Sequence, residues 1–146
     1  MSDNFLILLV DDDHTLVDIL AYAAKETFPE ARFLQVHTSS QLERYFQQLS
    51  GYGPRLILLD LDLNESKDGV DILASLRYDD QTSRLPVIIL TSRDSDTNVV
   101  DTTMLGAASY STKPADLQGW KQYLSTLSLY WKHTVRSVPV WFTNET

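Results

Sequence analysis

Cysteine is absent from this chain of 146 residues. Its absence excludes disulfide bonds, thiolate metal sites and cysteine nucleophiles, and it is compatible with a reducing cytoplasm. No apolar run approaches the length of a membrane span, and the first four residues have neither the positive charge nor the apolar core of a signal peptide. We therefore expect one cytoplasmic domain with a buried core and no membrane partner.

Positive charge is also scarce in this chain. Lys and Arg number 12 against 20 Asp and Glu, which gives a formal net charge of −8 at pH 7. No cluster or stripe of basic residues occurs along the sequence. The composition therefore argues against nucleic-acid backbone binding as the main role, and we expect no direct nucleic-acid partner.

The chain does contain a regular alternation of strand and helix patterns. Apolar runs and alternating segments predict five strands, at residues 5–10, 32–37, 56–60, 86–91 and 107–111. Apolar residues at steps of three and four predict five helices, the weakest of which carries Val99, Val100 and Met104. This pattern is typical of a doubly wound α/β fold with a five-stranded parallel sheet. Right-handed crossovers and short connections favour the flavodoxin-like strand order 2-1-3-4-5.

Acidic residues follow two of the predicted strands, at the edge where ligands of open α/β sheets bind. In the order 2-1-3-4-5, strands one and three are neighbours, so Asp11, Asp12 and Asp60 meet at one place. Clustered carboxylates repel one another unless a cation neutralises them, and Mg²⁺ accepts a few carboxylate oxygens while leaving room for phosphate. Two other strands end at Thr91 and near Lys113. Together these groups form a receptor for a phosphoryl group in transfer.

Each of these features has an ordinary alternative when it is taken alone. The acid run after the first strand could be a solvated helix start, because acids favour the N-terminal turn of a helix. Thr91 could be a plain strand-end residue, and Lys113 could lie in an exposed turn. Their joint occurrence, each at a strand end on one edge, favours the phosphoryl-binding interpretation.

Four motifs follow one another in a fixed order: Val10-Asp11-Asp12, Leu59-Asp60, Leu90-Thr91-Ser92 and Tyr110-Ser111-Thr112-Lys113-Pro114. Over roughly residues 5 to 130, this ordered set resembles the response-regulator receiver domain of bacterial two-component signalling. The resemblance implies that Asp60 is a phospho-acceptor, which attacks the phosphohistidine of a histidine kinase or phosphotransfer protein and forms an acyl phosphate. It implies a signalling domain that phosphorylates and dephosphorylates itself, not an enzyme.

The resemblance also implies a Mg²⁺ site. Asp12 and Asp60, with the backbone carbonyl of Asp62, would bind the ion directly, and Asp11 would hold it through water. The sequence departs from the family pattern just after these residues. Asn64 stands where receivers usually have proline, and the loop from residue 60 to residue 69 is one residue longer than the family norm. We therefore expect an atypical loop beside the metal site.

A conformational switch is implied as well. Lys113 would contact the acceptor carboxylate and then the phosphoryl oxygens. Thr91 would move toward the phosphoryl group and Tyr110 would swing inward, which presents a new surface to a downstream protein. Asp62 and Arg93 each lie two residues beyond a site residue. We hypothesise that they pair across the mouth of the site and screen it from attacking water.

The C-terminal tail is the other informative region. We assign residues 1–134 to the receiver domain and 135–146 to a tail that carries Trp141 and Phe142, with no output domain after it. Exposed apolar patches commonly mark interfaces, and the long last helix resembles that of stand-alone receivers that partner phytochrome-type kinases. We predict a homodimer or partner surface on this helix and the tail. The alternative is that Trp141 and Phe142 fold back onto the domain's own core.

Two rival functions are weighed against the phospho-acceptor. Leu59-Asp60-Leu61-Asp62 is similar to the Asp-x-Asp motif of haloacid-dehalogenase-type phosphatases, but there the second acid pair lies downstream, whereas here it lies upstream. A pseudo-receiver that binds proteins without being phosphorylated typically lacks one of the acids or the lysine, all of which this chain has. Turnover of a generic phosphate ester would favour the first, and failure to accept a phosphoryl group would favour the second.

Overall fold

The computed structural model describes residues 4–63, 65–92, 103–132 and 139–144. Within them the elements are β1 (Phe5–Val10), α1 (Leu16–Thr27), β2 (Ala31–Val36), α2 (Ser39–Gln48), β3 (Ser50–Tyr52), β4 (Leu56–Asp60), α3 (Gly69–Tyr78), β5 (Val87–Thr91), β6 (Ser109–Thr112), α5 (Leu117–Leu127), the short π-helix η1 (Ser128–Lys132) and β7 (Trp141–Thr143). Among the residues that the structure describes, no helix combines the length and the apolar composition that crossing a membrane requires.

Five parallel strands form the central sheet, in the order β2-β1-β4-β5-β6. Counted among these five alone, this is the flavodoxin-like order 2-1-3-4-5 that the sequence predicts. The element numbers differ because a short strand, β3, precedes the third strand of the sheet and belongs to a separate pair with β7. The α/β flavodoxin-like class and the five-stranded parallel sheet are therefore confirmed, and the prediction missed the additional pair.

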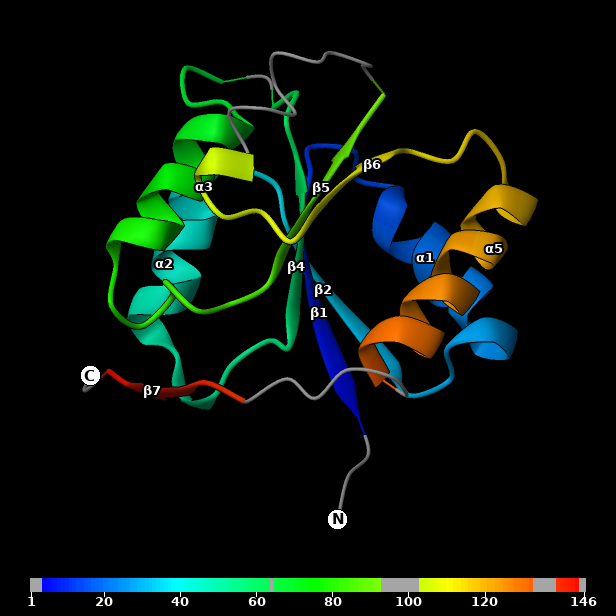
Figure 1. The fold of residues 1–146 in the computed structure, drawn as a ribbon, viewed down its shortest axis with the longest axis horizontal. Coiled ribbons are helices and arrows are strands. Elements are labelled where there is room, and N and C mark those ends of the chain that lie inside the picture. The colour runs from blue at the N-terminus through cyan, green and yellow to red at the C-terminus, as the bar shows by residue number, and fades with distance from the viewer. Residues whose placement is uncertain (1–3, 64, 93–102, 133–138, 145–146) are drawn as a thin grey trace.

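Helices cover both faces of the sheet (Figure 1). Helices α1 and α5 pack on one face, and α2 and α3 on the other. Along β1, Phe5, Ile7 and Leu9 enter the first core, whereas Leu8 and Val10 enter the second. This alternation is what a strand buried on both faces requires, and it explains why its sequence is a continuous apolar run.

Four α-helices are described where five were predicted. Residues 93–102, which contain most of the predicted fourth helix, lie outside the described part of the chain, and only Thr103 and Met104 are seen as helical. Gly106 follows with a φ of +83°, a conformation that glycine adopts without strain. The five-helix count therefore stays a prediction.

The C-terminal segment folds back onto the domain through the antiparallel pair of β3 and β7. Phe142 is 1% exposed and stacks on Phe46 of α2, with ring centroids 5.4 Å apart, whereas Trp141 is 59% exposed. The predicted alternative, in which the tail covers its own core, therefore holds for Phe142. The predicted domain boundary at residue 134 falls outside the described residues and stays a prediction.

Candidate functional site

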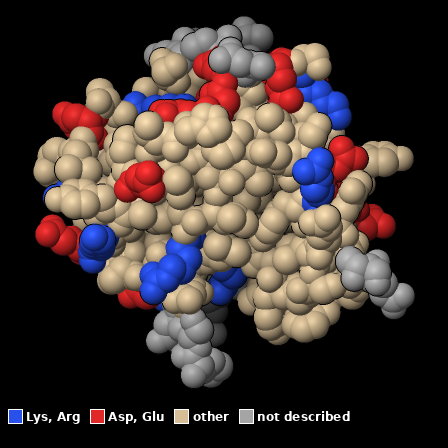
Figure 2. Space-filling view, turned by 180° about the vertical axis from the view of Figure 1, so that it is seen from behind, with Lys and Arg blue, Asp and Glu red and all other residues tan. Residues whose placement is uncertain are grey.

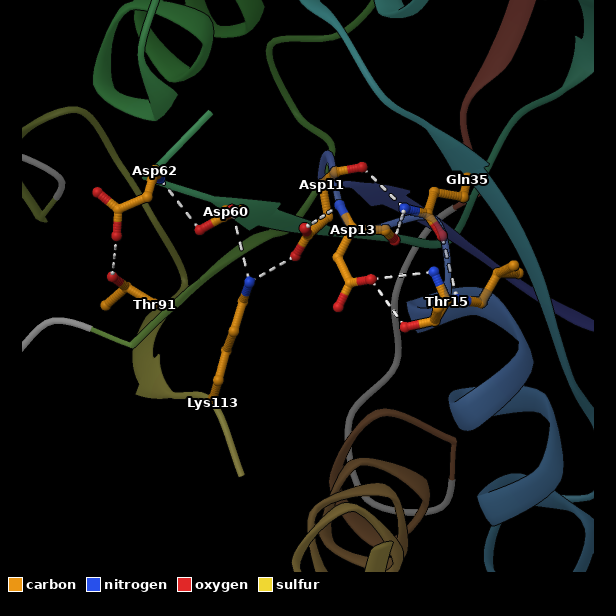
Figure 3. A network of polar contacts seen from close by, with 9 residues as sticks. Asp11, Asp13, Thr15, Gln35, Asp60, Asp62, Thr91 and Lys113 are labelled. Carbon is orange, nitrogen blue, oxygen red and sulfur yellow. Dashed lines mark hydrogen bonds and ion pairs between the residues drawn. The ribbon is translucent and has the colours of Figure 1, made fainter. Parts of the chain in front are cut away.

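The strand register places the predicted site residues together at the carboxyl edge of the sheet (Figure 3). The pairing of β1 with β4 brings Asp11, which follows β1, beside Asp60 at the end of β4. The pairing of β5 with β6 brings Lys113 just beyond Thr91, and the Lys113 backbone N–H donates to the Thr91 carbonyl at 2.8 Å. The sheet topology alone thus assembles groups from four separate segments.

Three carboxylates converge at this edge. One oxygen from each of Asp11, Asp12 and Asp60 lies within 4.8 Å of the other two, and Asp11 and Asp60 are only 2% and 4% exposed. The strands of the sheet end toward the top of Figure 1, and Figure 2 shows acidic side chains at this upper edge of the molecule. An oxygen-only donor set of this spacing suits a hard divalent cation such as Mg²⁺, which binds through a few carboxylates and keeps several waters. The residues present therefore fit the metal that the sequence predicts.

Among the described residues, Lys113 is the positively charged side chain that contacts these acids. Its Nζ lies 2.7 Å from Asp11 Oδ2 and 3.4 Å from Asp60 Oδ2, and its side chain is 22% exposed (Figure 3). The shorter of the two contacts is to Asp11, whereas the resemblance implied a contact with Asp60. Lys113 therefore bridges the two strand ends and offsets part of their negative charge.

Both oxygens of the Asp60 carboxylate have partners. Oδ1 accepts the backbone N–H of Asp62 at 3.0 Å, and Oδ2 faces Lys113. Burial raises the pKa of Asp60, and repulsion from Asp11 and Asp62 adds to this, against the lowering effects of the Asp62 N–H and Lys113. Burial alone would lower the pKa of Lys113, but its contacts with Asp11 and Asp60 outweigh burial and raise it. The site keeps its lysine charged and makes the Asp60 carboxyl a weaker acid than usual.

A glutamine that the sequence did not single out holds the acidic loop after β1. The side-chain amide of Gln35 donates to the backbone carbonyls of Asp11 and Asp13, both at 2.7 Å. Asp13 in turn accepts the hydroxyl and the N–H of Thr15, which lower its pKa. Asp13 thus acts at the start of α1, and Gln35 fixes the loop from the neighbouring strand. A polar residue in a strand carries no sequence signal for such a role.

Asp62 is turned away from the three clustered carboxylates. Its Oδ2 accepts the hydroxyl of Thr91 at 3.2 Å (Figure 3). Arg93, with which it was predicted to pair, lies outside the described residues. The part predicted for the Asp62 backbone carbonyl, as a metal ligand, stays a prediction.

The atypical loop after β4 is anchored by contacts that the sequence did not reveal. The Glu65 carboxylate accepts the N–H of Ser39 at 2.8 Å and its hydroxyl at 3.1 Å, which ties the loop to the start of α2. Gly69 packs so closely that an added Cβ would lie 2.6 Å from the backbone oxygen of Asp60. Only glycine fits there without moving the end of β4.

Tyr110, the predicted switch residue, lies on β6 and is half-buried. Its ring packs against the core on the α2 and α3 face, where Leu105 and Ala107 also pack. Tyr110 thus belongs to the strand that leads directly to Lys113. Its movement stays a prediction.

Comparison with known proteins places these features in a family context. A model of the response regulator receiver domain matches residues 7–125. Response regulator Rcp1 of Synechocystis sp. is 27% identical over 134 residues, which cover 89% of this chain and 90% of Rcp1. The alkaline phosphatase synthesis transcriptional regulatory protein PhoP of Bacillus subtilis is 33% identical over 111 residues, which cover 76% of this chain and 43% of PhoP.

Solved structures agree with the sequence comparison. The phosphorylated cyanobacterial phytochrome response regulator RcpA superimposes with a TM-score of 0.80 at 25% identity, covering 92% of this chain and 98% of RcpA. The Mn²⁺-bound form of Rcp1 superimposes with a TM-score of 0.77 at 26% identity, covering 92% of this chain and 99% of Rcp1. In each comparison, the likeness extends over nearly the whole length of both proteins.

Proposed function

This chain belongs to the family of response-regulator receiver domains, which are phospho-acceptor signalling domains and not classical enzymes, and we propose that Asp60 is its phospho-acceptor. The observation that carries the proposal is the position of the Asp60 carboxylate. It is buried at the end of β4, held by the Asp62 N–H and Lys113, and lies within 4.8 Å of Asp11 and Asp12 oxygens. A carboxylate so placed has both the orientation and the neighbouring charges that phosphoryl transfer requires.

The proposed phospho-donor is a phosphohistidine on a histidine kinase or a phosphotransfer protein. One Asp60 oxygen attacks the phosphorus, the P–N bond breaks, and its electron pair returns to the imidazole nitrogen of the donor. Lys113 stays in contact with the product and offsets charge on the phosphoryl oxygens. Asp11, Asp12 and Asp60 would hold Mg²⁺, with the Asp62 carbonyl, and the bound ion would supply charge neutralisation at the transferring group. Attack of water on the acyl phosphate would end the signal by self-dephosphorylation.

The proposed output is a change of surface that a downstream protein reads. The Thr91 hydroxyl turns to the phosphoryl group and Tyr110 follows inward, which alters β6 and α5. Exposed apolar residues on η1 and β7 offer a partner or homodimer surface: Leu129 is 66%, Tyr130 51% and Trp141 59% exposed. Light scattering of the wild type and the Tyr130→Ser variant tests the dimer. A monomer mass for both proteins would contradict the proposed homodimer.

Intact mass after incubation with Mg²⁺ and acetyl phosphate tests the phospho-acceptor itself. We expect the mass of one phosphoryl group to be added to the wild type and not to Asp60→Asn. Asp80→Asn is the matched control, because it removes the same charge from an exposed residue just after α3. An adduct that survives Asp60→Asn would place the acceptor elsewhere.

This mass measurement, together with an assay of phosphate-ester turnover, separates the rival functions. A pseudo-receiver would gain no mass at all, and a phosphatase of the haloacid-dehalogenase type would turn over generic phosphate esters. The family match and the convergence of all three acids with Lys113 support the phospho-acceptor over both.

A further inference from the structure

The hydroxyl of Thr91 points to Asp62 and not to Asp60, the proposed phospho-acceptor (Figure 3). Its oxygen lies 3.2 Å from Asp62 Oδ2, and the Thr91 side chain is 0% exposed. The hydroxyl group of a threonine has a single proton to donate. A proton that is given to Asp62 is therefore not available to another acceptor at the same time.

The Asp62 carboxylate is held in position by its own loop. The Asp62 backbone N–H donates to Asp60 Oδ1, and the next residue, Leu63, is 7% exposed in the core. Two positions later, Glu65 is tied to Ser39 at the start of α2 by two hydrogen bonds. Because the loop is anchored on both sides of Asp62, this carboxylate is a fixed acceptor and not a freely moving surface group.

A phosphoryl group on Asp60 would compete with this acceptor. Phosphoryl oxygens and a carboxylate are both anionic and both accept strong hydrogen bonds, so they compete for the one Thr91 proton. We propose that Asp62 is a positioning residue that holds the Thr91 hydroxyl in the unphosphorylated state, and that a phosphoryl group on Asp60 must displace it. The proposal rests on the proposed function in one respect, which is that Asp60 receives the phosphoryl group.

This competition lowers the apparent affinity of the site for a phosphoryl group. Only the fraction of molecules in which Thr91 has left Asp62 can bind the group with its full set of donors, and the apparent affinity falls by that fraction. Removing the Asp62 carboxylate should therefore tighten binding. The screening hypothesis for Asp62 predicts a different result for the same substitution, namely that the phosphoryl group is lost to water faster.

The hydrogen bond itself can be measured without metal or phosphoryl group. Urea unfolding of the metal-free wild type, Asp62→Ala, Thr91→Val and the double variant forms a double-mutant cycle. We expect the two substitutions to be non-additive by about fivefold in the unfolding equilibrium constant, the size of one ordinary hydrogen bond. Additive effects would overturn the proposal. If Asp62→Ala does not fold, Asp62→Asn keeps the shape and one acceptor oxygen, and it should give a smaller non-additivity of the same sign.

The competition is measured by titrating the same four proteins with beryllium trifluoride, a phosphoryl mimic, in excess Mg²⁺ by calorimetry. We expect Asp62→Ala to bind the mimic about fivefold more tightly than wild type does. In the Thr91→Val background, the same substitution should change the affinity by no more than about twofold, which is the effect of a partly screened charge. A change of equal size in both backgrounds would mean that Asp62 acts by repulsion alone, and the proposal would fail.

Asp80→Ala serves as the charge control, since Asp80 is exposed just after the far end of α3 and should leave the affinity unchanged. The two measurements also separate the proposal from the proposed function. Coupling in the metal-free cycle together with a wild type that binds no mimic would refute Asp60 as phospho-acceptor. A wild type that binds the mimic but shows no coupling would refute only the role of Asp62.

Discussion

Asp60 and Phe142 are both almost completely buried, at 4% and 1% exposure, but their surroundings differ in kind. Around Asp60, the carboxylates of Asp11 and Asp12 crowd in, and one lysine, Lys113, offsets part of the negative charge. Around Phe142, the contacts are all of types that stabilise a fold. The ring stacks on Phe46, and the Asn144 amide donates to two backbone carbonyls near the end of α2.

The difference separates what the fold needs from what the chemistry needs. Buried like charges lower the stability of a folded protein and persist where a ligand or reaction uses them. A buried aromatic ring and satisfied backbone carbonyls raise the stability and take no part in chemistry. Substitutions at the carboxyl edge should therefore alter phosphorylation with little loss of stability, and substitutions in β7 should do the reverse.

The largest effect on stability is expected for Phe142→Ala. Removing a fully buried aromatic ring leaves a cavity, and the free energy of unfolding should fall by about 3–4 kcal/mol in urea titrations. Phosphorylation of the variant by acetyl phosphate should be unchanged under conditions where it remains folded. Trp141→Ala, on the opposite side of the same strand, should cost less than about 1 kcal/mol because that ring is 59% exposed. Equal losses for both variants would show that β7 does not pack through Phe142.

The contrast also explains what the sequence could predict. Asp11, Asp60, Thr91 and Lys113 are found from sequence because each is the last residue of a strand or follows it directly, and parallel strands bring their carboxyl ends to one edge. The β3 and β7 pair joins segments about ninety residues apart, and neither three-residue strand has a pattern of its own. Such pairing depends on tertiary packing that local periodicity does not record.

Gln35 and Glu65 were missed for a related reason. Each is an ordinary polar residue in sequence, and its role comes from the backbone groups that the fold brings within reach of its side chain. The resemblance did indicate that the loop after Asp60 is atypical. It could not show how Glu65 anchors that loop.

Mg²⁺ should stabilise the carboxyl edge and leave β7 unaffected. At a tenfold excess over its dissociation constant, a ligand that binds only the folded state raises the free energy of unfolding by about 1.4 kcal/mol. We expect a rise of this size for the wild type on adding Mg²⁺, and its loss on chelation. Asp12→Ala should abolish most of the rise, because it removes one of the three clustered carboxylates. An equal rise in the variant would point to binding elsewhere on this acidic protein.

Asp60→Asn should make the metal-free protein more stable, by about 1 kcal/mol at pH 7, because it removes a buried carboxylate that Asp11 and Asp62 repel. Folding raises the pKa of Asp60 above its ordinary value of 3.8, so the folded state binds this proton more tightly than the unfolded state does. The group therefore lowers stability as the pH rises from 3.8 through its raised pKa. The stability difference between variant and wild type should grow over that interval and vanish below it. Urea titrations across this pH range check the prediction. A difference that does not change with pH would show that folding does not raise the pKa of Asp60.

Glu65→Gln gives the smallest expected effect, and it should alter both the stability of the fold and the site around Asp60. Glu65 stabilises the start of α2, as an anion at a helix N-terminus does, and it also anchors the loop that carries Asp62. Replacing the carboxylate should cost about 0.5 kcal/mol of stability. It should also weaken Mg²⁺ binding, measured by calorimetry. Glu43→Gln, on the exposed side of the same helix, matches the change in charge and should leave Mg²⁺ binding unaltered. If both variants bind Mg²⁺ like wild type, the loop is held in place without Glu65, and its contacts belong with those of Phe142, as support for the fold alone.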